Sequence, residues 1–309
     1  MSATGTTVAR ITNVAIHPGT EAAELYRFAR VAGFPADETL NLKRFPGKTI
    51  EQLTFTHVYL GGTAAWRSDD IRQIDWALPA AMQDSQLNNV LAQYFPDGKP
   101  TAAFEPSRVL EGSIPERVYR DTLESLVASL DQSGALAGFG LASSVFCLLL
   151  PEGVVLVDGV STGNNGVDSL HGLGGYHGSI HAKRGSKTET VYYAVGVYSE
   201  DGNGISVFPD AWKNTCAVFY HELCEARTDP DVEDAIRAGN SPHAKDFLGW
   251  YSPQGGEIGD IPLEVGTKLT SIIREVKLAA GSRTVPVQFM WSNAVAGPEG
   301  PITRKHATA

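Results

Sequence analysis

The 309-residue sequence predicts an α+β fold, in which a mixed, twisted β-sheet packs against one long helix. Residues 53–60 and 190–198 have the β-branched and aromatic content that is typical of strands. Residues 211–227 predict the long helix, because Asp210 is a suitable N-cap and Pro230 disfavours continuation. A composition of 42% hydrophobic and 19% charged residues allows a full core, in one large domain or two ordinary ones.

The chain divides into an N-terminal extension and a main domain. Residues 1–50 predict the extension, with a strand at 8–16, a helix at 20–32 and a Pro/Gly-punctuated end. Residues 51–309 predict the main domain. After its first strand, this domain is expected to contain helices at 68–82, 85–94 and 115–130, and a hairpin of strands 144–150 and 154–157 across Pro151-Glu152-Gly153.

The segment 158–178 is rich in Gly, Ser and Asn, and it predicts a long irregular loop before the strand at 190–198. A loop of this kind in a compact domain is usually either disordered or functional. After the long helix, the pattern predicts a short helix at 231–238 and a late strand at 285–291.

Charge and composition exclude several classes of partner. A net charge of -10 leaves no basic stripe for nucleic acid or an anionic membrane surface. No apolar run approaches membrane-spanning length, and residues 1–18 lack the basic and apolar parts of a secretory signal. We therefore expect a soluble, cytoplasmic protein without nucleic-acid or membrane partners. Buried free thiols are the expected state of the three cysteines, Cys147, Cys216 and Cys224.

The long helix ends in the motif His221-Glu222-Leu223-Cys224-Glu225. At about 100° per residue, His221 and Glu225 lie one turn apart on the same helix face, and Glu222 lies beside them. In a His-Glu-x-x-His helix two imidazoles bind zinc and the Glu is the general base; here a carboxylate replaces the second imidazole. The motif predicts His221 and Glu225 as metal ligands and Glu222 as the base that activates a metal-bound water. An amphipathic helix end with exposed acids is the alternative interpretation.

A zinc site needs at least one further ligand, which must come from outside the helix. Glu257 is the first choice and Asp260 the second, because both lie among glycines that allow a close backbone approach. Asp229 is a third candidate, but on an ideal helix it is rotated by about 80° from His221, and capping of the helix end is its favoured role. One imidazole with two carboxylates is a hard ligand set, so Zn2+ is expected and Mn2+ and Ca2+ are alternatives.

His177 follows the glycine-rich segment and is the second candidate catalytic residue. Its position predicts substrate binding or oxyanion stabilisation, and Tyr176 is an alternative donor. A histidine that only makes a structural hydrogen bond is the competing interpretation.

Several segments together resemble one family. They are His221-Glu222-Leu223, Glu225-Ala226, Thr228-Asp229-Pro230, Gly249-Trp250-Tyr251 and Glu257-Ile258-Gly259-Asp260, with Gly61-Gly62, Trp66, Tyr176-His177-Gly178 and Trp291-Ser292-Asn293 in the matching order. The pattern, over roughly residues 53 to 295, is similar to the Exordium / phosphate-induced protein family and its fungal and bacterial relatives. The resemblance implies a zincin-like fold and metal site within residues 51–309.

The chain departs from the plant members of that family, which are secreted and carry cysteines near the histidine segment and after the acidic motif. Here Gly175 and Ile261-Pro262 stand at those places. The extracellular, growth-related role of the plant proteins is therefore not expected for this chain.

The leading hypothesis is a zinc-dependent hydrolase, a peptidase or amidase that acts on a peptide or small-molecule substrate. His221, Glu225 and Glu257 or Asp260 would hold the metal, Glu222 would be the base, and His177 would polarise the scissile carbonyl. Two alternatives are a non-catalytic metal-containing binding protein, which would use the loop at 158–178, and a biosynthetic metalloenzyme that acts on a small peptide or metabolite.

Overall fold

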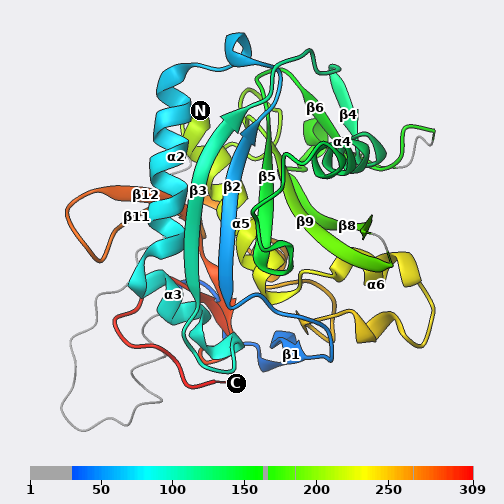
Figure 1. Cartoon of the computed structure of the whole chain (residues 1–309). Helices are drawn as coiled ribbons and strands as arrows, with labels where there is room; N and C mark the ends of the chain where they lie inside the picture. The colour runs from blue at the N-terminus through cyan, green and yellow to red at the C-terminus, as the bar shows by residue number, and fades with distance from the viewer. Residues whose placement is uncertain (1–29, 163–165, 185, 267, 309) are drawn as a thin grey trace, which may run out of the picture.

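The computed structural model describes residues 30–162, 166–184, 186–266 and 268–308 (Figure 1). The strand expected at 8–16 and most of the helix expected at 20–32 lie outside the described residues. Arg30, at the start of the described part, forms a β-bridge with Glu299.

A five-stranded mixed sheet forms the centre of the fold, with the strand order β3-β2-β5-β9-β8. Four neighbouring strands run parallel, and β8 lies antiparallel to β9 at one edge (Figure 1). The mixed sheet with its helices confirms the α+β class. The strands are β2 (Gln52–Tyr59), β3 (Thr101–Val109), β5 (Ser144–Leu150), β8 (Gly175–Arg184) and β9 (Lys187–Val197).

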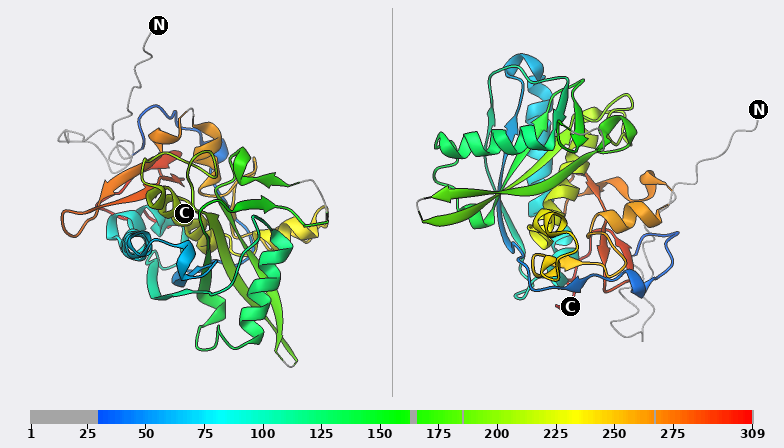
Figure 2. Two further views of the ribbon diagram at one scale, coloured as in Figure 1. Left: turned by 90° about the horizontal axis from the view of Figure 1, so that it is seen from above. Right: turned by 90° about the vertical axis from the view of Figure 1, so that its right-hand side faces the viewer.

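Helices cover both faces of this sheet, as Figure 2 shows from two further directions. Helices α2 (Ser68–Gln83) and α5 (Ala211–Thr228) pack on the face that carries Tyr59 and Cys147. Helix α4 (Arg120–Gln132) packs on the opposite face. Parallel strands in a sheet covered on both faces are apolar along their whole length, which explains why every residue of β5 is buried.

Helix α5 is the central helix of the fold. Every residue from Asn214 to Thr228 is buried, because the helix lies between the sheet, α2 and strand β12 (Thr284–Gln288). A helix that is surrounded on all sides belongs to the core of a protein. The alternative of exposed acids at the end of this helix is therefore wrong, and its His and Glu side chains need partners inside the protein.

Two predicted elements are corrected by the strand pairing. The hairpin expected between 144–150 and 154–157 is wrong, because β5 lies between β2 and β9 in the central sheet. Strand β6 (Val155–Asp158) instead pairs with β4 (Arg117–Tyr119) and β7 (Val167–Asp168) in a separate sheet. The helix expected from residue 115 begins at Arg120, because the three residues of β4 pair as a strand.

The segment 158–178 is not a continuous loop, because β8 begins at Gly175. Glycines within this strand are explained by close packing. A Cβ atom at Gly175 would lie 2.4 Å from the carbonyl oxygen of Val195 on β9. A Cβ atom at Gly178 would lie 3.1 Å from the hydroxyl of Tyr193. The glycine content that suggested a loop therefore allows the edge strand to pack closely.

Further elements lie at both ends of α5: Lys213 in its first turn pairs with Glu275 of β11 (Ile273–Lys277), and Arg227 in its last turn donates to the carbonyl of Glu51. Residues 30–50 pack on the C-terminal end of α5, since the amide of Ile50 donates to the carbonyl of Arg227. Within this part, β1 (Lys43–Arg44) pairs with β10 (Trp250–Tyr251). The late strand expected at 285–291 is divided at Phe289 between β12 and β13. The other helices and strands outside the central sheet are α3 (Ser85–Leu91), α6 (Val232–Ala238), α7 (Asp260–Val265), β13 (Met290–Ser292) and β14 (Gly297–Glu299).

Among the described residues, none of the helices combines the length and apolar character that crossing a bilayer requires. The three cysteines, Cys147, Cys216 and Cys224, are buried free thiols, as the sequence predicted.

Candidate metal centre

His221 and Glu225 form the helical half of the site. The Nε2 atom of His221 lies 3.0 Å from Oε2 of Glu225, one turn further along α5. Both side chains are buried, at 7% and 3% exposure. The predicted pairing on one helix face is thus present, and both potential ligand atoms point into the protein.

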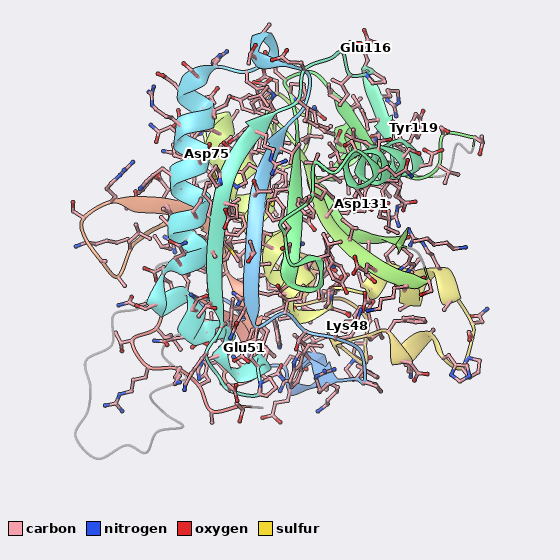
Figure 3. The ribbon with its side chains drawn as sticks, in the orientation of Figure 1. Lys48, Glu51, Asp75, Glu116, Tyr119 and Asp131 are labelled. Carbon is pink, nitrogen blue, oxygen red and sulfur yellow. The ribbon has the colours of Figure 1, made fainter. Side chains whose placement is uncertain are left out.

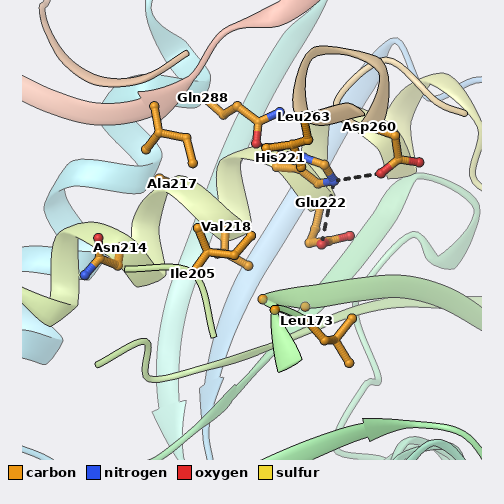
Figure 4. Close-up of a pocket in the computed structure, with 14 residues that line it drawn as sticks. Leu173, Ile205, Asn214, Ala217, Val218, His221, Glu222, Asp260, Leu263 and Gln288 are labelled. Carbon is orange, nitrogen blue, oxygen red and sulfur yellow. Dashed lines mark hydrogen bonds and ion pairs between the residues drawn. The ribbon is translucent and has the colours of Figure 1, made fainter. Parts of the chain in front are cut away.

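The segment between Glu257 and Asp260 supplies the other half. The backbone amides of Gly259 and Asp260 donate to Oε1 of Glu225, at 3.0 and 3.1 Å, which leaves Oε2 facing His221. A Cβ atom at Gly259 would lie 2.5 Å from Nδ1 of His221, so the backbone can approach this closely only because residue 259 is glycine. Asp260 Oδ1 lies 3.7 Å from Nε2 of His221 (Figure 4).

These contacts make one compact donor group. Donor atoms of His221, Glu225 and Asp260 all lie within 4.8 Å of one another, so the group can hold a metal ion. Its nitrogen and carboxylate oxygens are ligand types that divalent cations accept. Asp260, the second choice as the third ligand, therefore joins the helical pair.

Gln288 on β12 orients the imidazole. Its Nε2 donates to the carbonyl of Gly259 at 2.6 Å, so its Oε1 faces Nδ1 of His221, 3.1 Å away. Nδ1 of His221 must then carry the proton, and Nε2 is free to bind a metal. No motif in the sequence pointed to Gln288. An uncharged polar residue at the end of the apolar run Val285-Pro286-Val287 was the available signal.

Glu222 lies beside the donor group of His221, Glu225 and Asp260, and it lines a cavity of about 160 Å³ (Figure 4). Its Oε1 is 3.9 Å from Nε2 of His221. The cavity walls combine the polar group of His221, Glu222, Asp260 and Gln288 with apolar side chains. These apolar side chains are Leu173, Ile205, Ala217, Val218, Leu263 and Ile273. A small substrate group in the cavity would reach Glu222 and Asp260.

His177 projects from β8 toward the same carboxylates. Its Nδ1 lies 3.6 Å from Oε2 of Glu222 and 3.8 Å from Oε2 of Glu225. Its Nε2 donates to the carbonyl of Asp229 at 3.2 Å. His177 is not one of the residues that line the cavity, so the structure places it behind Glu222 and away from the expected position of a scissile carbonyl.

Glu257 and Asp229 lie outside the donor group of His221. Glu257 Oε1 is buried without a hydrogen bond in the described part of the chain, 3.7 Å from Nε2 of His177. Asp229 Oδ1 accepts from the amide of Gly249 at 2.7 Å. Asp229 is the C-cap residue of α5, but its backbone amide makes the capping bond, to the carbonyl of Glu225, and its side chain instead ties the helix end to Gly249.

The electrostatics reflect a concentration of buried carboxylates. Burial lowers the pKa of His221, but Glu225 and Glu222 outweigh it and hold this pKa well above its usual range. Burial, and then the charge of Glu225, raises the pKa of Glu257 well above normal. The charge of Glu225, and then burial, raises the pKa of Asp260 to about 7. A bound cation would relieve this repulsion between carboxylates.

Comparison of the chain with models of protein families, with curated proteins and with solved structures gives no match.

Proposed function

We propose that this chain is a metal-dependent hydrolase of peptide or amide bonds, with zinc held by His221, Glu225 and Asp260. The proposal rests on one observation above all: these three side chains form a buried donor group at a cavity that Glu222 also lines. Three protein ligands leave a coordination position open, as hydrolytic zinc sites require.

Zinc, when bound at these ligands, supplies a Lewis acid that polarises a carbonyl and makes water more acidic. Glu222 is positioned to accept a proton from a water molecule in the cavity. Burial raises the pKa of Glu222, which makes its carboxylate a stronger base. The water oxygen bonds to the carbonyl carbon, the C–N bond breaks, and Glu222 passes the proton to the leaving nitrogen.

His177 has a positioning role in this proposal, in place of the carbonyl contact that the sequence suggested. Its hydrogen bond to the carbonyl of Asp229 fixes the ring, and its Nδ1 faces Glu222 at 3.6 Å. The imidazole therefore restricts where the Glu222 carboxylate lies without touching the cavity.

We also propose that the fold is zincin-like and that the chain is related to the Exordium / phosphate-induced protein family. An antiparallel edge strand, β8, packs beside the ligand helix α5, and this arrangement supports a zincin-like fold. The contact between the His221 motif and the distant segment 257–260 supports the resemblance to the Exordium / phosphate-induced protein family.

Metal analysis and peptide cleavage test the proposal together. Protein purified without added metal should contain one equivalent of zinc, and His221→Ala should contain none. Glu222→Gln should keep the metal and lose cleavage of a mixed peptide library, followed by mass spectrometry. Absence of a stoichiometric metal in the unaltered chain would refute the proposal. Metal without cleavage would favour a metal-containing binding protein.

A further inference from the structure

A second group of donor atoms adjoins the first. Donor atoms of His177, Glu222 and Glu225 lie within 4.8 Å of one another, and all three side chains are buried. The two groups share Glu225, but neither contains both imidazoles. His177 and His221 belong to different groups, although both imidazoles face Oε2 of Glu225, at 3.8 and 3.0 Å.

The hydrogen bonds around His177 leave a nitrogen available for a metal. A carbonyl oxygen only accepts, so the bond to the carbonyl of Asp229 places a proton on Nε2 of His177. In the neutral ring, Nδ1 then has a free lone pair, and it faces Glu222 and Glu225. A histidine that is held by a hydrogen bond from its other nitrogen is the usual arrangement of a metal ligand.

Glu222 lies between the two imidazoles. It is 4% exposed, and its nearest ion-pair partners are Nδ1 of His177 at 3.6 Å and Nε2 of His221 at 3.9 Å, both beyond hydrogen-bond distance. Its two oxygens face different imidazoles, with Oε2 toward His177 and Oε1 toward His221. A buried carboxylate carries a large desolvation cost, which a cation at this position would offset.

The balance of charge agrees with two cations. Glu222, Glu225, Glu257 and Asp260 are four carboxylates around the two imidazoles, and their ion-pair partners are these imidazoles. Glu257 lies in neither donor group, and one divalent ion leaves one of the three charges that Glu222, Glu225 and Asp260 carry when ionised. Paired metal sites in hydrolases lie about 3.5–4 Å apart, a spacing that one shared carboxylate can span.

We infer that His177, Glu222 and Glu225 form a second, weaker divalent-cation site beside the His221–Glu225–Asp260 centre, and that its occupation inhibits the enzyme. It is the weaker site because the second ion shares Glu225 and lies close to the charge of the first. Inhibition follows because a cation on Glu222 occupies the lone pair that the base requires. The inhibitory part rests on the proposed function; the second site does not.

Zinc binding to the chelator-treated full chain, measured by isothermal titration calorimetry, tests the site without any assay of activity. The unaltered protein should bind two ions in separate steps. His177→Gln should keep the tight step and lose at least about tenfold in affinity for the weak one. Glu222→Gln should do the same, so the test does not depend on the folding of one variant. His181→Gln, a half-exposed histidine on the same strand, is the matched control and should bind as the parent does.

A single binding step in the parent, or a weak step unchanged in both His177→Gln and Glu222→Gln, would overturn the second site. A separate assay of peptide cleavage tests whether occupation of the second site inhibits the enzyme. Cleavage should rise to one equivalent of zinc and fall as the weak step saturates, and the fall should disappear in His177→Gln whatever its activity at one equivalent. Activity that keeps rising to two equivalents would overturn the inhibition. No cleavage at any zinc level would count against the proposed function, while the two binding steps would still decide the second site.

Discussion

Nε2 of His221 lies 3.0 Å from Oε2 of Glu225, and the other oxygen of Glu225 accepts two backbone amides from residues 259 and 260. One carboxylate thus links the ligand helix to a segment more than thirty positions further along the chain. The two amides fix Oε1, so Oε2 is the oxygen that is available to a metal. Glu225 is therefore the residue on which both donor groups depend.

Replacement of this carboxylate by an amide should abolish tight metal binding. Glu225→Gln keeps an acceptor for the two amides but removes the charge, so we expect at least a ~100-fold loss of zinc affinity with little change in the circular dichroism spectrum. Competition with a chromophoric chelator measures the affinity. Glu264→Gln, an exposed carboxylate on α7, is the control. Equal affinities in the two variants would contradict the assignment of Glu225.

Gln288 should matter for the metal although it is not a ligand. Gln288→Leu removes the acceptor for Nδ1–H of His221 and the donor to Gly259, so the ring is free to turn and change tautomer. We expect zinc affinity to fall about 10- to 100-fold, measured by the same competition. Gln83→Leu, an exposed position at the end of α2, should bind zinc normally. If Gln288→Leu also binds normally, its hydrogen bond does not orient His221.

A methyl group at residue 259 should disturb the centre directly. In Gly259→Ala the added carbon would meet Nδ1 of His221 at 2.5 Å and Oε1 of Glu225 at 2.9 Å. We expect a loss of roughly 1–3 kcal/mol in the free energy of unfolding, together with weaker zinc binding. Gly140→Ala is the control, because its nearest neighbour would be 3.7 Å away. Chemical denaturation measures the change, and equal stability of the two variants would argue against this close contact.

Buried His57, which pairs with half-buried Asp75, should make stability depend on pH. Nδ1 of His57 lies 2.6 Å from Oδ1 of Asp75, which projects from α2 (Figure 3). Burial lowers the pKa of His57 and outweighs the opposing effect of Asp75. In the unfolded state the pKa of His57 is about 6.5, so below this pH the unfolded state binds more protons than the native state. The free energy of unfolding therefore decreases as the pH is lowered, until the native pKa is reached.

Denaturation of the parent and of His57→Asn between pH 7 and about pH 5 isolates this effect from other titrating groups. The difference in the free energy of unfolding between the two proteins should shrink as the pH falls. A difference for His57→Asn that is independent of pH would show that the native pKa of His57 is not lowered. Asp75, whose own pKa is lowered, contributes its loss only below about pH 3.8.

Local sequence patterns were sufficient to predict several helices and strands of the fold. The helix predicted at 211–227 and the strands predicted at 53–60 and 190–198 agree closely with α5, β2 and β9. The pairing between strands could not be predicted in the same way, because each strand pairs with residues far away in the chain. The apolar run of β5 fits either a hairpin or a buried parallel strand until its neighbours are known, and the glycines of β8 resemble a loop until they are packed on β9.

The sequence by itself determined that His221 and Glu225 share a helix face with Glu222 beside them, because a helix repeats about every 3.6 residues whatever its surroundings. Only the tertiary structure decided which acid joins them. Asp260 lies in the donor group of His221, whereas Glu257 faces His177. The reason is that backbone amides of the segment 257–260 bind Glu225, and this contact orients each neighbouring side chain. The position of His177 behind Glu222 likewise follows from the packing of β8 on α5, which no local pattern encodes.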